Sequence, residues 1–118
     1  MITKPIDVTD ATFATAVLQS DLPVVVDFWG ERCLPCKMIN SWMARLAQAY
    51  AGQIVVARIN VDNNKETIAA CDVRSVPTIL FMAKGNVYHC QVDKFNEADL
   101  RGLVDAFLDR LQAEAAAP

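Results

Sequence analysis

Hydrophobic positions along the chain fall into short continuous runs that predict strands. The runs Val24–Trp29 and Ile54–Val61 are rich in β-branched and aromatic residues, as is typical of strands buried on both faces of a parallel sheet. The runs Thr78–Met82 and Val87–Val92 are separated only by Ala83–Asn86, which contains a glycine. A linker this short between two strand patterns predicts an antiparallel hairpin.

Apolar residues three or four positions apart predict helices around these strands. In the first helix, Phe13, Val17 and Leu18 are expected to share one buried face, and Thr9 or Asp10 can cap its start. Asn96 and Asp99 suit the start of the last helix, since short polar side chains cap the free N–H groups there. The predicted helices span Asp10–Ser20, about Cys33–Tyr50, about Lys65–Cys71 and about Glu97–Leu111.

The alternation of strands and helices indicates an α/β fold with a mixed sheet, parallel except for the final hairpin. With 118 residues, the chain is the size of one domain. We expect residues 1–112 to form that domain and the alanine-rich segment 113–118 to fray. Because 53% of the residues are hydrophobic and 21% charged, a globally disordered chain is excluded.

The charge and hydropathy of the chain exclude several classes of partner. A net charge of −3 and a pI of about 5.0 argue against a nucleic-acid-binding protein. No apolar run approaches the roughly 20 residues that a membrane span requires. The first residues contain no apolar signal core, so we expect a cytoplasmic protein.

The sequence contains four cysteines, of which only Cys33 and Cys36 are close together. At the start of a helix, cysteines three positions apart share one face, so their sulfurs can meet. Unpaired N–H groups at that helix end favour a thiolate. We expect the more exposed Cys33 to attack a substrate disulfide and the shielded Cys36 to resolve the mixed disulfide.

Asp27 lies inside the strongly apolar run Val24–Trp29. Burial of an ionised carboxylate is unfavourable, so its pKa should be raised. A carboxyl group that is neutral part of the time can exchange a proton with Cys36. The alternative is an aspartate that only caps a strand end.

The segment Ser75-Val76-Pro77-Thr78 places a proline at the opening of a strand. A cis bond before Pro77 would leave the backbone of Val76 extended and free to pair with a substrate peptide. An ordinary trans proline that ends a helix is the alternative, and the residues alone do not decide between them.

Together these motifs resemble the thioredoxin family over nearly the whole chain. The resemblance implies a thioredoxin fold, with a five-stranded mixed sheet flanked by four helices. It implies that Cys33 is the nucleophile, Cys36 the resolving cysteine and Asp27 the buried acid, and that Pro77 is cis. The matching stretches are Asp27–Trp29, Cys33–Met38, Arg58–Asp62, Val76–Thr78 and Gly85.

The chain also departs from the family pattern around the expected site. Arg32 replaces the usual tryptophan, Leu34 the usual glycine between the cysteines, and Ser41 a proline in the helix. Asp93 replaces a glycine of the substrate platform, and Arg58 a lysine near the buried acid. Charge at the docking face suggests a narrower range of substrates.

The predicted site thus consists of three groups of residues. The catalytic residues are Cys33, Cys36 and Asp27. Two residues are expected to tune pKa values, namely Arg58 beside the buried acid and Arg32 beside Cys33. The alternative for Arg32 is that it forms a solvated charge pair with Glu31. The substrate-binding residues are Trp29, Arg32, Leu34, Pro35, Val76, Pro77 and Asp93.

The leading function is reduction of protein disulfides. We expect a monomer that needs no cofactor beyond its redox-active cysteines and that a dithiol or flavoprotein reductase recycles. The first alternative is an adaptor or assembly factor with the same fold that binds a partner without turnover. The second is a metal or iron–sulfur site, for which one pair of cysteines supplies only two ligands. Cys71 or Cys90 would have to approach, or a second chain would have to complete the set.

Several other residues have simpler interpretations. Cys71 is expected to be a small buried apolar residue, with a regulatory or dimerising thiol as the alternative. One of the neighbours His89 and Cys90 should face outward, because adjacent strand residues alternate. Trp42 and Met43 are expected in the core rather than at the ligand.

Overall fold

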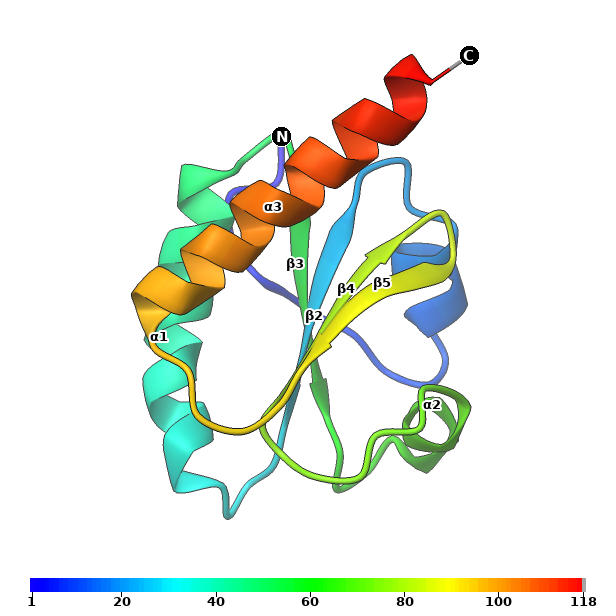
Figure 1. The fold of residues 1–118 in the computed structure, drawn as a ribbon. Helices are drawn as coiled ribbons and strands as arrows, with labels where there is room; N and C mark the ends of the chain where they lie inside the picture. Colours follow the sequence, from blue (N-terminus) through cyan, green and yellow to red (C-terminus); the bar gives the residue numbers. More distant parts are fainter. Residues whose placement is uncertain (118) are drawn as a thin grey trace.

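The computed structural model describes residues 1–117 as a five-stranded mixed sheet with helices on both faces (Figure 1). The strand order is β1-β3-β2-β4-β5. Strands β1, β3 and β2 are parallel to one another, whereas β4 is antiparallel to both β2 and β5. The elements are β1 (Ile6–Asp7), η1 (Ala14–Leu18), β2 (Val24–Trp29), α1 (Leu34–Ala49), β3 (Val55–Asn60), α2 (Lys65–Ala70), β4 (Thr78–Ala83), β5 (Asn86–Gln91) and α3 (Glu97–Ala116).

The α/β class, the hairpin and the mixed sheet of the sequence prediction are confirmed. Strand β2 lies at the centre of the sheet, between β3 and β4, and five of its six residues are buried. This explains its nearly continuous apolar sequence. Strand β1 contains only two residues, too few for any pattern, and only the family resemblance implied a fifth strand.

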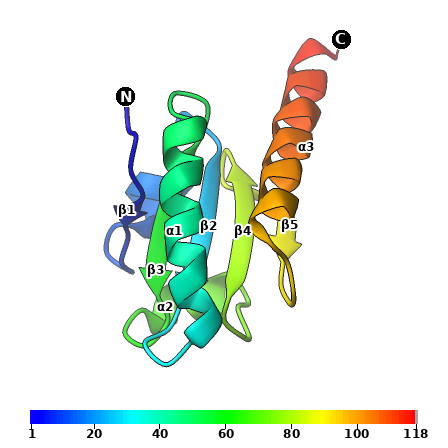
Figure 2. The same ribbon diagram turned by 90° about the vertical axis from the view of Figure 1, so that its left-hand side faces the viewer.

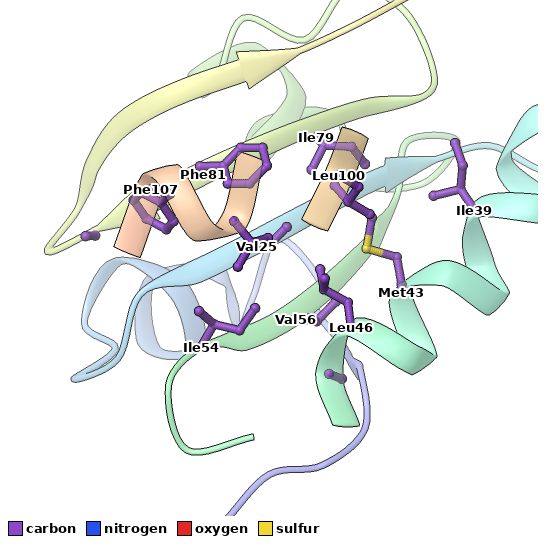
Figure 3. Close-up of a cluster of buried hydrophobic side chains, with 13 residues drawn as sticks. Val25, Ile39, Met43, Leu46, Ile54, Val56, Ile79, Phe81, Leu100 and Phe107 are labelled. Carbon is purple, nitrogen blue, oxygen red and sulfur yellow. The ribbon is translucent and has the colours of Figure 1, made fainter. Parts of the chain in front are cut away.

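Two hydrophobic layers hold the helices against the sheet. Helices α1 and α3 cover one face and η1 and α2 the other (Figure 2). Under α1 and α3, Met43 and Leu100 meet side chains of the central strands, among them Val25, Val56 and Phe81 (Figure 3). The opposite layer contains Val17, Val24, Val26, Phe28, Ala57 and Leu80. Successive residues of β2 therefore enter opposite layers, as a strand buried on both faces requires.

Helix α3 begins with the predicted capping box. The Asn96 side chain accepts a hydrogen bond from the N–H of Asp99, whose carboxylate accepts one from the N–H of Asn96. The helix continues past the expected end at Leu111 to Ala116, and Pro118 lies outside the described residues. Although α3 has 20 residues, no helix within residues 1–117 is long and apolar enough to cross a membrane.

The first predicted helix is the main local difference. Instead of an α-helix over residues 10–20, the chain forms turns and then the short π-helix η1. Phe13 and Val17 are buried as expected, but Leu18 is exposed. Asp10 does not cap its own helix: its carboxylate accepts hydrogen bonds from the N–H groups of Glu66 and Thr67 at the start of α2.

Candidate active site

Cys33 and Cys36 form a disulfide at the start of α1, directly after the carboxyl end of β2. Cys33 is the N-cap residue, and the N–H of Cys36 points at its sulfur at 3.2 Å. Cys33 is 8% exposed and Cys36 3%, so the order of exposure of the two residues agrees with the expectation that Cys33 is the more accessible. A backbone N–H directed at the Cys33 sulfur would stabilise a thiolate there after reduction.

Asp27 is fully buried in the middle of β2. Its Oδ2 faces the Nε of Arg58 at 3.4 Å, and its Oδ1 has no hydrogen-bond partner within residues 1–117. Burial raises the pKa of Asp27 to about 6, and the charge of Arg58 opposes the rise. Within residues 1–117, the Asp27 carboxylate accepts no hydrogen bond from a backbone N–H group. The alternative that Asp27 only caps a strand end is therefore not supported.

Arg58 extends the environment of Asp27 across three strands. Asp7, Arg58 and Asp27 are direct cross-strand neighbours on β1, β3 and β2. The Arg58 guanidinium lies 4.9 Å from the centre of the Trp29 ring and 4.0 Å from the Asp7 carboxylate. The predicted proximity of Arg58 to the buried acid is confirmed.

Two hollows flank the disulfide. One, of about 470 Å³, is lined by Arg32, Cys33, Leu34, Pro35 and Val76, together with Gly30, Val61 and Asp62. The other, of about 440 Å³, lies between α1 and the segment that joins β5 to α3. It is lined by Pro35, Met38, Ile39, Trp42, Ser75, Val76, Pro77, Asp93, Lys94 and Phe95.

The bond between Val76 and Pro77 is cis, as the resemblance implied. Val76 and Pro35 line both hollows, so this loop lies beside the disulfide. Six of the seven residues predicted to bind substrate are brought together around these hollows. The exception is Trp29, which lines neither hollow and instead packs against Arg58.

Several residues that line the hollows were not expected at the site from the sequence. Met38 is 60% exposed beside Leu34, which is 74% exposed, and their spacing of four on α1 could have indicated a shared face. Trp42 was expected only in the core. It packs there against Phe95 with ring centres 6.1 Å apart, but it also lines the second hollow.

Polar contacts fix the loop that precedes Cys33. The N–H of Glu31 donates to the Asp62 carboxylate at 2.9 Å, and the Asn60 amide donates to the Glu31 carboxylate at 3.2 Å. Within residues 1–117, Glu31 and Arg32 form no direct ion pair with each other, and Glu31 is exposed. The side chain of Arg32 is exposed.

The other cysteines lie away from the disulfide. Cys71 is partly buried, and desolvation raises its pKa. Cys90 and His89 are both exposed, because β5 is an edge strand. Among the described residues, no group of three or more His, Cys, Asp or Glu side chains is arranged to hold a metal ion.

Comparison with known proteins agrees with this geometry. A family model described as Thioredoxin matches residues 4–108. The chain is 39% identical to a thioredoxin of Pseudomonas aeruginosa, over 86% of this chain and 94% of the relative. It is 36% identical to a thioredoxin of Haemophilus influenzae, over 88% and 97% of the two chains. The chain belongs to the thioredoxin family.

A solved structure agrees with the fold as well. A mutant thioredoxin from Halobacterium salinarum superposes with a TM-score of 0.80 at 31% identity, covering 90% of this chain and 92% of the other. Family membership and the paired cysteines together make the protein a thiol–disulfide oxidoreductase. Thioredoxins act through a redox-active disulfide on protein substrates and are recycled by reductases.

Asp93, where the thioredoxin pattern has glycine, adopts a left-handed backbone with a φ of +68°. This conformation is unfavourable for residues with a Cβ, by roughly 1–2 kcal/mol, although aspartate tolerates it better than most. Asp93→Gly should therefore raise the free energy of unfolding by up to about 1 kcal/mol, measured by urea denaturation. Asp93→Asn removes the same charge but keeps the Cβ. An equal gain in both variants would contradict the backbone explanation.

Proposed function

We propose that the protein reduces disulfides of protein substrates by two successive exchange steps at Cys33 and Cys36. The Cys33 thiolate attacks one substrate sulfur, which forms a mixed disulfide and releases the other substrate sulfur as a thiolate. Cys36 then attacks the Cys33 sulfur, which forms the Cys33–Cys36 disulfide and releases the second substrate thiol. Two electrons thus pass from the protein to the substrate.

The observation that carries this proposal is the placement of the disulfide at a helix start, with Cys33 as its more exposed residue. The order of the two steps follows from this asymmetry. Cys33 can meet a large substrate, whereas Cys36, at 3% exposure, is reached only by the neighbouring sulfur. Attack by Cys36 requires its thiolate, so a proton must leave it during the second step.

Asp27 is the proposed acceptor of that proton. Its pKa of about 6 places it near neutral pH, where a group can both accept and return a proton. Arg58 tunes this pKa by favouring the carboxylate form. Trp29 supports Arg58 in this role, because its ring lies against the guanidinium.

The two hollows are the proposed docking face for substrate. Leu34, Pro35 and Pro77 offer apolar contact, and the backbone N–H and C=O of Val76 are the groups proposed to pair with a peptide strand. Arg32 and Asp93 place opposite charges on different sides of the disulfide. We expect these charges to restrict the range of substrates relative to an uncharged face, and Arg32 to tune the pKa of the Cys33 thiol.

The remaining parts of the proposal concern the cell. We propose that the protein acts as a monomer in the cytoplasm, where thiols are kept reduced. A dithiol or flavoprotein reductase would return the Cys33–Cys36 disulfide to the dithiol. The net charge of −3 favours protein substrates over nucleic acid.

Trapping tests this mechanism directly. Cys36→Ser should stop the reaction after the first step, so that substrate proteins remain disulfide-linked to Cys33 and are identified after non-reducing electrophoresis. The variant Cys36→Ser/Cys90→Ser excludes capture through the exposed Cys90. The same substrates should be held by both variants and by neither wild-type protein nor Cys90→Ser alone. Capture that disappears with Cys90 would refute the proposed role of Cys33.

A further inference from the structure

The largest hollow described in the molecule lies away from the disulfide. It has a volume of about 740 Å³ and lies between the amino-terminal segment, α1 and β3, which are neighbours in Figure 2. It shares no lining residue with either hollow beside the disulfide. Its lining residues are Thr3, Lys4, Pro5, Asp7, Lys37, Asn40, Ser41, Ala44, Gln48 and Arg58.

Positive charge is concentrated in this groove. Lys4, Lys37 and Arg58 line it together with one carboxylate, that of Asp7, although the whole chain has a net charge of −3. Lys4 and Lys37 form no ion pair with any carboxylate of residues 1–117. The Asn40 amide adds an uncharged donor to the same walls. Such a set of donors suits a multiply charged oxyanion.

Arg58 lines the groove, and most of its N–H donors have no hydrogen-bond partner within residues 1–117. Its side chain is 17% exposed, and only its Nε–H makes a hydrogen bond, to Asp27 at 3.4 Å. Its other ion contact, with Asp7, is 4.0 Å long. By contrast, Arg45 holds Glu97 with two bonds of 2.8 and 2.7 Å. Within residues 1–117, neither terminal nitrogen of Arg58 makes a hydrogen bond, and neither is completely buried, so their donors remain available to a ligand.

We propose that this groove binds the phosphate group of a small metabolite, held by Lys4, Lys37 and Arg58. A fork of guanidinium donors and two flexible ammonium groups matches the three terminal oxygens of a phosphate. The groove is larger than one phosphate ion requires, so the rest of a phosphate ester would lie along α1 beside Asn40 and Gln48.

Binding there is linked to the buried acid. Within residues 1–117, Arg58 is the charged residue that contacts Asp27. Asp7 of β1 lies on the other side of Arg58, and Lys37 of α1 lines the groove. A phosphate that contacts Arg58 opposes its attraction for the Asp27 carboxylate and so favours the protonated acid. By reciprocity, protonation of Asp27 strengthens phosphate binding. This link to catalysis rests on the proposed function of Asp27, whereas the binding site does not.

Nuclear magnetic resonance titration of the oxidised full-length protein tests the site. At constant ionic strength, inorganic phosphate and ribose 5-phosphate should both cause saturable shifts of the amides in residues 3–7, 37–48 and 58. Free ribose should cause none. Lys37→Gln should weaken phosphate binding roughly five-fold, whereas Lys65→Gln, which removes an equal charge from α2, should leave it unchanged. Shifts that do not saturate, or equal weakening in both variants, would overturn the proposal.

The link to Asp27 is read from the carbon resonance of its carboxyl group. Saturating phosphate should move the pH midpoint of this resonance upward in the wild-type protein. In Lys37→Gln, the phosphate concentration that gives half of this shift should be roughly five-fold higher. An unchanged midpoint with phosphate bound would overturn the link. Failure of either test would leave trapping by Cys36→Ser unaffected, so the groove and the redox mechanism are judged separately.

Discussion

Asp27→Asn should make the oxidised protein more stable at pH 7 by up to about 3 kcal/mol. The pKa of Asp27 is raised from its ordinary value of 3.8 to about 6. Each pKa unit corresponds to about 1.4 kcal/mol. The rise in the pKa of Asp27 therefore means that its ionisation destabilises the folded state by about 3 kcal/mol. An amide has nearly the same shape and does not ionise, which removes the cost.

The pH dependence gives the sign of this effect. Between pH 3.8 and about 6, the folded state binds a proton at Asp27 that the unfolded state has lost. Stability therefore falls as pH rises through this window. The loss is complete above pH 6–7 and absent below about pH 4. Wild-type and Asp27→Asn proteins should therefore approach equal stability at low pH.

Urea denaturation between pH 3.5 and 8 measures this difference. Asp109→Asn is the matched control, because Asp109 is exposed on α3 and surface substitutions usually change stability by less than about 0.5 kcal/mol. Its curve should follow that of the wild-type protein. If Asp27→Asn instead follows the wild-type curve, the buried acid is not the source of the pH dependence.

Cys33→Ser should lower the rate of disulfide reduction by at least roughly 10³-fold, because a serine hydroxyl cannot replace a thiolate nucleophile. Insulin reduction with a chemical dithiol for recycling measures this rate. Substrate binding should change little, since the docking residues around the two hollows remain. Cys90→Ser, which removes an exposed cysteine outside the site, should keep the full rate.

The same experiment weighs the adaptor alternative. An adaptor would show no turnover in the wild-type protein, and Cys33→Ser would then bind its partner as the wild type does. Turnover that persists in Cys33→Ser would contradict both the role of Cys33 and the order of the two exchange steps.

The elements with strong local signals could be predicted from the sequence. Strand β2 is recognisable because it is buried on both faces, and the start of α3 because Asn96 and Asp99 cap it within four residues. The pair Cys33 and Cys36 could be predicted for the same reason. Their spacing of three, at the start of a predicted helix, brings both sulfurs to one face, where the structure joins them.

Features that depend on distant contacts could not be predicted. Asp10 looks like a cap for the helix that follows it, but its partner Thr67 is 57 residues away. The last turns of α3 contain alanines but no large apolar residue after Leu111. They are held by polar contacts instead: Tyr88 of β5 donates to Glu114, which also pairs with Arg110. The groove at Arg58 likewise arises only when three separate segments meet.

The short strand β1 has a consequence for any work with this protein. Its Asp7 is the outermost member of the row that continues through Arg58 to Asp27, and the N–H of Val8 binds the carbonyl oxygen of Arg58 at 2.8 Å. The charge of the amino-terminal strand is therefore coupled to the buried acid through Arg58. An affinity tag or a truncation at this end is not a neutral modification, and redox behaviour is best compared between proteins with the same amino terminus.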